Sequence, residues 1–421
     1  MEVAIGVIIL VVTLVLGIPI PFAFGATVIW LASSLGFQTD FLLSAGYSQL
    51  NSVVLLAIPL FILAGGIMEK GRIGEALIGL VEKFVGRAKG GLGAAAIFAC
   101  AIFGSISGSA SATLSCIGSI MEPRMTKAGY EKGYTAALMA AACPLGLLIP
   151  PSSAQILYAW SSNTSVLACF TATVIPGLIL VFFLTVVNAI MVRKMPIKVA
   201  EKQTPQVWVQ DTGKRTVKAV PALLMPFIIL GGIYGGIMTP TEAAAVSVLY
   251  AIPVGIFIYR GLTFRGLLNA IADTSTTTGV VMVMFFLVMI MSRLLVMENV
   301  PNQIADALLG ITDNKYIILL MINLFMIIIG MLMDDVSGIL LCTPILLPIV
   351  TGIGIHPVHF AAILGVNLGM GNITPPTAPM LYLSGRVCGA KINKMLSPIM
   401  ILIIFAWVPT LLLTTFIPEL A

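Results

Sequence analysis

Charged residues are scarce in this chain, at 9% of 421 residues, against roughly a quarter in soluble proteins. Hydrophobic residues make up 59%. So little charge cannot cover a surface that faces water, which excludes an ordinary soluble globular protein. We therefore expect an all-α polytopic membrane protein, and the length could hold about a dozen spans of about 20 residues.

Reactive motifs are also missing. The six cysteines form no C-x-x-C pair, so we interpret them as small apolar residues rather than a disulfide or metal site. The sequence contains no P-loop, H-E-x-x-H or G-x-S-x-G pattern, which argues against an ATP-driven pump and against an intramembrane enzyme.

Long apolar runs predict the spans, and each run is taken to cross the membrane once. We expect spans at 3–20, 22–36, 51–68, 134–160, 166–192, 219–236, 240–259, 274–296, 357–384 and 396–417. Two doublets, 91–105 with 110–121 and 316–333 with 338–350, are predicted to enter and return on one side as re-entrant hairpins. Amphipathic stretches at 71–87, 262–272 and 300–310 look interfacial.

The basic residues predict the orientation. Of the 22 Lys and Arg residues, 20 lie between spans on one side, in five segments: 70–89, 124–132, 193–218, 260–265 and 386–394. Because Lys and Arg beside spans stay in the cytoplasm, these segments are predicted to be cytoplasmic and residue 1 to lie outside. The net charge of +5 therefore indicates membrane topology, and we expect no nucleic-acid partner.

An internal repeat organises the chain. A shift of 225 residues places Pro150-Pro151 on Pro375-Pro376, Gly146 on Gly371 and Ser152 on Thr377. Under the predicted orientation the first unit starts outside and the second inside, so the repeats are inverted. Such architectures bind substrate and coupling ions near the bilayer midplane, where helices are broken.

The first candidate site is the sequence GSISGSASAT at 104–113, between the two runs of the first doublet. Glycine permits the chain to reverse, and the hydroxyls could ligate a cation or bind a solute. The alternative is close helix packing through small residues.

The second candidate is its repeat mate, with Asp334 and Asp335 between apolar runs. Carboxylates inside a membrane are costly and indicate a functional site. The alternative is a loop at the membrane surface.

The third candidate is the pair of double-proline breaks. Adjacent prolines remove amide donors and unwind a helix, so freed carbonyls could ligate Na⁺ and half-helix amino termini could face an anion. A simple kink is the alternative. Arg293, near the outer end of a span, is expected to snorkel to the interface, with substrate gating as the alternative reading. Glu242, after Thr239 and Pro240, is read as part of a helix start.

With these motifs together, the chain resembles the large membrane subunit of a tripartite ATP-independent periplasmic (TRAP) transporter, within the ion transporter superfamily. The resemblance spans essentially the whole length. It implies Na⁺-coupled import of an organic anion, a carboxylate or sulfonate, into a bacterium across the inner membrane, with a periplasmic amino terminus and no organic cofactor. It also implies a periplasmic substrate-binding protein and a small membrane subunit, expected as a separate chain because no further helical segment precedes residue 1.

The resemblance further implies an elevator mechanism, with fixed scaffolds and a moving transport domain. The expected divisions are scaffolds at 1–68 and 219–297, arms at 69–89 and 298–314, transport units at 90–165 and 315–394, a span with a basic loop at 166–218 and a final span at 395–421.

The family pattern also implies residue roles. A first Na⁺ is expected near Ser105, Ser107, Gly108, Ser109, Gly146 and Pro150. A second is expected near Gly330, Asp334, Gly371 and Thr374. Substrate is expected near Ser111, Ser152, Asp335, Ser337, Asn372 and Thr377.

Two other classes of membrane transport protein are compatible with much of this sequence pattern. A stand-alone ion-coupled dicarboxylate transporter or antiporter shares the inverted repeats and would work without a binding protein. An ion channel would show turnover without saturation.

Overall fold

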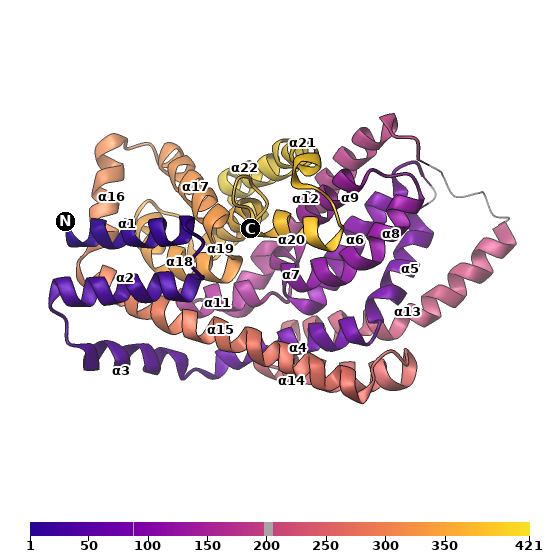
Figure 1. The fold of residues 1–421 in the computed structure, drawn as a ribbon, viewed down its shortest axis with the longest axis horizontal. Coiled ribbons are helices and arrows are strands. Elements are labelled where there is room, and N and C mark those ends of the chain that lie inside the picture. The colour runs from indigo at the N-terminus through magenta and orange to yellow at the C-terminus, as the bar shows by residue number, and fades with distance from the viewer. Residues whose placement is uncertain (87, 198–204) are drawn as a thin grey trace.

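The computed structural model describes residues 1–86, 88–197 and 205–421, without the side chains of residues 39 and 205–209. Every regular element in these ranges is helical (Figure 1). Eight of the described helices are long and apolar enough to cross a membrane, and the bent pair Lys132–Leu148 and Ser153–Ser161 makes up to nine. The all-α, multi-pass class predicted from the sequence is confirmed.

The first half opens with a helical layer that leads into an arm. Two short helices, α1 (Glu2–Val15) and α2 (Ile20–Leu35), pack side by side (Figure 1). They are followed by α3 (Thr39–Leu50), α4 (Ala57–Lys70) and the arm helix α5 (Ile73–Val85). The expected spans 3–20 and 22–36 are thus helices of 14 and 16 residues, and α3 lies in a stretch where no helix was predicted.

The first hairpin and the first broken helix follow. The hairpin runs up α6 (Gly91–Ser107), reverses, and returns through α7 (Ala110–Thr113), a π turn and α8 (Ser119–Lys127). The broken helix consists of α9 (Lys132–Ala142), α10 (Leu145–Leu148) and α11 (Ser153–Ser161). The long helix α12 (Val166–Met191) completes this half.

The second half repeats this order. Its first helices are α13 (Pro205–Tyr234), α14 (Pro240–Pro253) and α15 (Phe264–Met297). After the arm helix α16 (Val300–Ile311) come the hairpin helices α17 (Lys315–Leu332) and α18 (Asp335–Gly352). The second broken helix is α19 (Pro357–Gly371) with α20 (Pro379–Val387), and the chain ends with α21 (Ile392–Leu402) and α22 (Val408–Phe416).

Local chemistry explains where α14 begins. The Thr239 hydroxyl accepts from the Glu242 amide, and the Glu242 carboxylate accepts from the Thr239 amide at 2.8 Å, with Pro240 at the first helical position. This reciprocal capping satisfies two amides that would otherwise lack partners. The helix start predicted around Glu242 is confirmed.

Two boundaries differ from the sequence prediction. Residues 262–272, expected to form a separate interfacial stretch, mostly form the first turns of α15, since Thr263 caps the Gly266 amide. The predicted basic loop 193–218 is helical from Pro205 onward as part of α13. Its residues 198–204 lie outside the described part of the chain.

The two broken helices form the centre of the molecule. Residues 133–148 and 359–373 are all buried. Trp407, on the π turn that precedes α22, is also fully buried: its indole nitrogen donates to the Ala141 carbonyl at 3.2 Å, and its ring lies against Gly369. The first break, at residues 150–152, is also buried, which is where irregular backbone is tolerated at membrane depth, whereas Pro376 and Thr377 of the second break are exposed.

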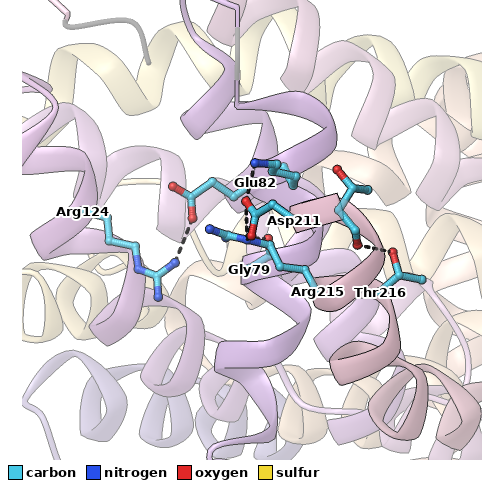
Figure 2. Close-up of polar contacts among 8 residues, drawn as sticks. Gly79, Glu82, Arg124, Asp211, Arg215 and Thr216 are labelled. Carbon is cyan, nitrogen blue, oxygen red and sulfur yellow. Dashed lines mark hydrogen bonds and ion pairs between the residues drawn. The ribbon is translucent and has the colours of Figure 1, made fainter. Parts of the chain in front are cut away.

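A charged network holds the arm helix α5 (Figure 2). Arg124 of α8 donates to Glu82 of α5 at 2.9 Å, and Lys83 of α5 pairs with Asp211 of α13. Arg215 of α13 donates to the Gly79 carbonyl at 3.2 Å. Helix α5 is thus bonded on one side to α8 of the first hairpin and on the other to α13.

Candidate functional site

The tip of the first hairpin is built from small residues that allow a tight reversal. Gly108 ends α6 with a φ of +61°, a conformation that L side chains rarely adopt. Just beyond it the Ser109 hydroxyl caps the Ala112 amide, and the Thr113 hydroxyl donates to the Ser109 carbonyl at 2.8 Å. Ser107 and Thr113 hydroxyls lie 3.1 Å apart. The tip is therefore a folded loop rich in oxygen atoms.

A glycine pair brings this hairpin against the first broken helix. A Cβ atom on Gly104 would lie 2.6 Å from the Gly146 Cα, closer than real Cβ contacts come. A Cβ on Gly146 would lie 3.4 Å from the Ser109 carbonyl oxygen. Glycine at position 104, and the tight space at Gly146, thus allow α6 and α10 to touch through their backbones.

The break itself is bonded to the hairpin tip. The chain leaves helical geometry at Ile149 and resumes it at Ser153, with a cis bond between Pro150 and Pro151. The Ser153 hydroxyl and amide both point at the Gly108 carbonyl oxygen, at 2.8 and 3.3 Å. The start of α11 thereby finds a partner that its own helix cannot supply.

The second half shows the same crossing. A Cβ on Gly330 of α17 would lie 3.0 Å from the Gly371 Cα, at the end of α19. Pro375-Pro376 is again cis. With its side-chain amide turned so that the nitrogen faces the hairpin, Asn372 donates to the Gly330 and Met333 carbonyls at 3.2 and 2.9 Å. In each half, a residue of the broken helix close to the break thus satisfies a carbonyl of the hairpin.

The two aspartates lie at the start of α18, the returning helix of the second hairpin. Asp334 is the N-cap of α18 and Asp335 is in its first turn, where a negative charge is favourable. The Ser337 hydroxyl contacts both Asp334 and the Met284 sulfur of α15, the latter at 2.7 Å. The alternative of a surface loop is thus excluded for Asp334, which lies at the start of a helix that packs against α15.

Five buried side-chain oxygens in the described residues have no hydrogen-bond partner, and the Ser152 hydroxyl is one of them. The Ser152 hydroxyl is fully buried and accepts and donates no hydrogen bond there. An orphaned buried polar group is costly. Ser152 lies between the double proline and α11, which marks this position as one where a bound species would complete the hydrogen bonding.

The structure brings most of the expected first-ion residues together. Ser107, Gly108, Ser109 and Gly146 meet within one cluster, and the Pro151 carbonyl oxygen lies 3.2 Å from where a Gly108 Cβ would be. Ser105 is different, because its hydroxyl donates to the Ile102 carbonyl of its own helix at 2.7 Å. Pro150 lies in the break beside this cluster.

The other expected residues lie in two groups. Gly330, Gly371 and Asn372 meet as described, while the Thr374 hydroxyl turns back to the Met370 carbonyl at 2.7 Å. Of the expected substrate residues, Ser111 contacts the Ser109 hydroxyl at 3.1 Å. Thr377 is exposed. The halves pack together where the Gln155 amide of α11 reaches the Ala361 carbonyl of α19, at 3.4 Å.

The available ligand atoms suit a hard monovalent cation. They are backbone carbonyl and hydroxyl oxygens, together with the carboxylates of Asp334 and Asp335 in the second half. Within the described residues no group of three or more His, Cys, Asp and Glu side chains could hold a metal ion. All six thiols are free and buried.

Gly104, Thr113 and Ser153 lie within the candidate segments predicted from the sequence, but none of the three was among the residues expected to bind an ion or the substrate. Gly104 was recoverable, because it is 226 positions before Gly330, one residue off the repeat shift. Ser153 gave no such signal, since the residue at the shifted position is Ala378.

The fold and site define a multi-pass membrane transporter of two matched halves, each a hairpin crossed by a broken helix. The family model for the tripartite ATP-independent periplasmic transporter, DctM component, matches residues 7–420. The chain belongs to this family of TRAP transporter large permease proteins, as the resemblance of its motifs predicted.

Three curated relatives are each 36% identical to the chain. The isethionate TRAP transporter permease protein DctMQ of Oleidesulfovibrio alaskensis aligns with 97% of this chain, which spans 64% of that relative. The C4-dicarboxylate TRAP transporter large permease protein DctM of Pseudomonas aeruginosa aligns over 87% of the chain and 85% of the relative. For the sialic acid TRAP transporter large permease protein SiaM of Vibrio cholerae the shares are 80% and 78%.

Among solved structures, the YdaH transporter of Alcanivorax borkumensis, described as having an unusual topology, has a TM-score of 0.61. It is 17% identical and covers 90% of both chains. This likeness supports the fold.

Proposed function

We propose that this chain imports a small organic anion, a carboxylate or sulfonate, and that an inward Na⁺ gradient drives the import. One observation carries the proposal: each half closes a backbone break of its broken helix against the tip of its hairpin, through Gly104–Gly146 and Gly330–Gly371. Broken helices that meet near the midplane are the usual sites for solute and coupling ion in transporters with inverted repeats.

The first Na⁺ is assigned to the first cluster. Its ligands would come from Ser107, Ser109 and the backbone around Gly108, Gly146 and Pro150, with Ser105 less directly placed. Oxygen ligands of this kind suit a cation that must be bound and released in each cycle. The second Na⁺ is assigned to the equivalent crossing, near Gly330, Asp334, Gly371 and Thr374.

The substrate is assigned between the two tips, to Ser111, Ser152, Asp335, Ser337, Asn372 and Thr377. The orphaned Ser152 hydroxyl supports this, as does the start of α11, because helix amino termini favour anions. Asp335 would oppose an anion unless Na⁺ or a solute hydroxyl lies between them.

The solute class follows from the relatives. Isethionate, C4-dicarboxylates and sialic acid, named for three relatives, all carry a carboxylate or sulfonate. We assign the chain to the bacterial inner membrane with its amino terminus in the periplasm, as the placement of Lys and Arg favours. A periplasmic binding protein would deliver the solute, and a small membrane subunit would accompany this chain.

An elevator movement would carry the site across the membrane. The hairpins and broken helices, within 90–165 and 315–394, would move against scaffolds 1–68 and 219–297, linked by the arms that contain α5 and α16. The division is supported by the bonding within the first transport unit, where Ser153 and Gly108 tie the break to the tip.

Uptake into proteoliposomes tests the proposal. The chain is reconstituted with its small subunit, and radiolabelled isethionate, succinate and sialic acid are added outside with the matching binding protein. We expect one of them to accumulate only with an inward Na⁺ gradient and the binding protein. Accumulation without Na⁺ would remove the coupling. Accumulation by this chain alone would instead favour a stand-alone transporter.

A further inference from the structure

A polar cavity lies away from the hairpin tips, at the far ends of three helices that begin at or pass the candidate site. Its volume is about 380 Å³, and it is bordered by α3 and α15 of the proposed scaffold and by α11 and α18 of the proposed transport unit. Scaffold and moving parts thus meet at this cavity as well as at the tips.

The three helices fix how far apart the cavity and the site are. Ser153 and Trp160 are seven residues apart on α11, Ser337 and Pro344 are seven apart on α18, and Met284 and Arg293 are nine apart on α15. At a rise of about 1.5 Å per residue, each helix covers about 11–14 Å between the candidate site and the cavity. The cavity therefore lies at a uniform short distance from where the solute is proposed to bind.

The lining is chemically selective. Among the described residues that line it, the single charged side chain is Arg293, and Ser48, Gln49 and Ser292 add hydroxyl and amide groups. None of the ion pairs in the described chain includes Arg293. Its guanidinium lies 5.9 Å from the centre of the Phe41 ring, which fixes its position without neutralising its charge.

The cavity also borders a contact between the two proposed domains. Trp160, which lines it, packs on Phe285 of α15 with ring centres 4.9 Å apart, and donates to the Ser52 hydroxyl at 3.1 Å. A concave space with one unpaired cation and a few hydrogen-bonding groups is typical of a binding site for a small anion.

We propose that this cavity is an entry site, in which Arg293 receives the organic anion before it reaches the hairpin tips. This inference rests on the proposed function, because the predicted orientation places the cavity on the periplasmic side. Guanidinium groups bind carboxylates and sulfonates through two parallel hydrogen bonds. Arg293 would be a specificity-determining residue that raises the local concentration of anions and leaves the later steps unchanged.

Quenching of Trp160 fluorescence tests the cavity without transport. The signal of Trp160 is obtained by subtracting that of a Trp160→Phe variant, and the probes are iodide, an anion, and acrylamide, which is neutral. We expect the iodide quenching constant at low salt to fall about twofold or more in Arg293→Gln and to persist in Arg293→Lys, because the local charge sets the local anion concentration. Acrylamide quenching should stay the same in both.

Arg265→Gln is the matched control, because Arg265 is an exposed arginine at the other end of α15. It should leave iodide quenching unchanged. Equal iodide constants in wild type and Arg293→Gln would overturn the entry site and leave Arg293 as an interfacial anchor.

Uptake kinetics give the second readout, with whichever of isethionate, succinate or sialic acid the wild type imports. Arg293→Gln should raise the half-saturating concentration about fivefold or more with a maximal rate within about twofold, the sign of lost binding rather than lost turnover. A lower maximal rate at an unchanged half-saturating concentration would contradict the proposal. If the wild type imports none of the three, the proposed function fails, and iodide quenching still decides whether the cavity concentrates anions.

Discussion

Ser153 donates its hydroxyl to the carbonyl oxygen of Gly108 at 2.8 Å, and its amide points to the same oxygen. The bond joins residues 45 positions apart, one at the tip of a hairpin and one at the start of a helix beyond a break. Because the bond is buried, it couples the position of the tip to that of α11. Both would therefore have to move as one unit during transport.

Replacing Ser153 with Ala tests this coupling. The amide bond remains, so we expect a loss of about 0.5–1.5 kcal/mol, the usual net contribution of one hydrogen bond, seen as a lower melting temperature in detergent. If the tip holds Na⁺, the half-saturating Na⁺ concentration for uptake should also rise. Ser162→Ala removes a hydrogen bond to the Tyr158 carbonyl at the other end of α11. This control variant should leave the Na⁺ response unchanged. An unaltered Na⁺ response in Ser153→Ala would show that the bond is only structural.

The two glycine crossings should tolerate no side chain. In Gly104→Ala or Gly330→Ala the new Cβ would meet backbone atoms at 2.6 or 3.0 Å, so the hairpin must separate from the broken helix. We expect a loss of about 1–3 kcal/mol, as for other overpacked sites, together with slower uptake. Gly279→Ala on α15, where nothing lies within 4 Å, should keep both stability and transport. Normal melting of both crossing variants would contradict the close approach.

Asp335 should be needed for transport but not for folding. We predict that Asp335→Ala inserts normally while uptake falls roughly tenfold or more, the effect of losing one hydrogen bond to a charged group. Asp313→Ala, in the exposed loop before α17, should transport as the wild type does. Uptake at the wild-type rate in Asp335→Ala would place the binding site elsewhere.

The contact between Arg124 and Glu82 should contribute little to stability. Both side chains are about one-third exposed, and exposed pairs are worth about 0.2–1 kcal/mol. A double-mutant cycle with Glu82→Gln and Arg124→Gln, measured by thermal unfolding, should give a coupling energy in this range that shrinks as salt is added. A coupling above about 2 kcal/mol would indicate a site that excludes water, as in buried pairs.

A buried chain of side-chain amides in the second half should contribute more to stability than the exposed pair of Arg124 and Glu82. Asn367 donates to Asn323 at 2.9 Å, and Asn323 donates to Thr415 at 3.0 Å. Asn323→Leu leaves Asn367 and Thr415 without this partner, so we expect a loss of about 1–3 kcal/mol. Adding Asn367→Leu should recover part of it, because the second substitution removes one unsatisfied group. If the double variant lost as much stability as the two single variants lose together, this account would be contradicted.

The sequence predicted the helical class, the hairpins and the breaks well, because each leaves a strong local signal. Two proline pairs unwind a helix in any context, and a run of Gly and Ser inside an apolar doublet marks a reversal. The capping role of Glu242 could be predicted because Thr239 and Pro240, just before it, are typical of a helix start. In each case the physical cause is contained within a few positions of the chain.

What the sequence missed depends on tertiary contacts. The partner of Gly108 is Ser153, and nothing in either segment names the other. Helix α3 was overlooked because its polar residues hide the apolar pattern, although Gly46 lies directly against Phe286 of α15. The start of α15 was assigned to the interface because Arg265 and Asn269 interrupt its apolar character. Packing, rather than local preference, decides the first two cases, whereas the Thr263 cap begins α15.

Helix α15 is longer than a bilayer requires. Its 34 residues rise about 51 Å, whereas the hydrocarbon layer is about 30 Å thick. The helix must therefore tilt strongly or project beyond the hydrocarbon layer, and a thicker membrane would draw it upright. Because α15 carries both Met284 beside the hairpin and Arg293 at the cavity, the lipid composition of the host membrane would set the angle at which the scaffold presents them.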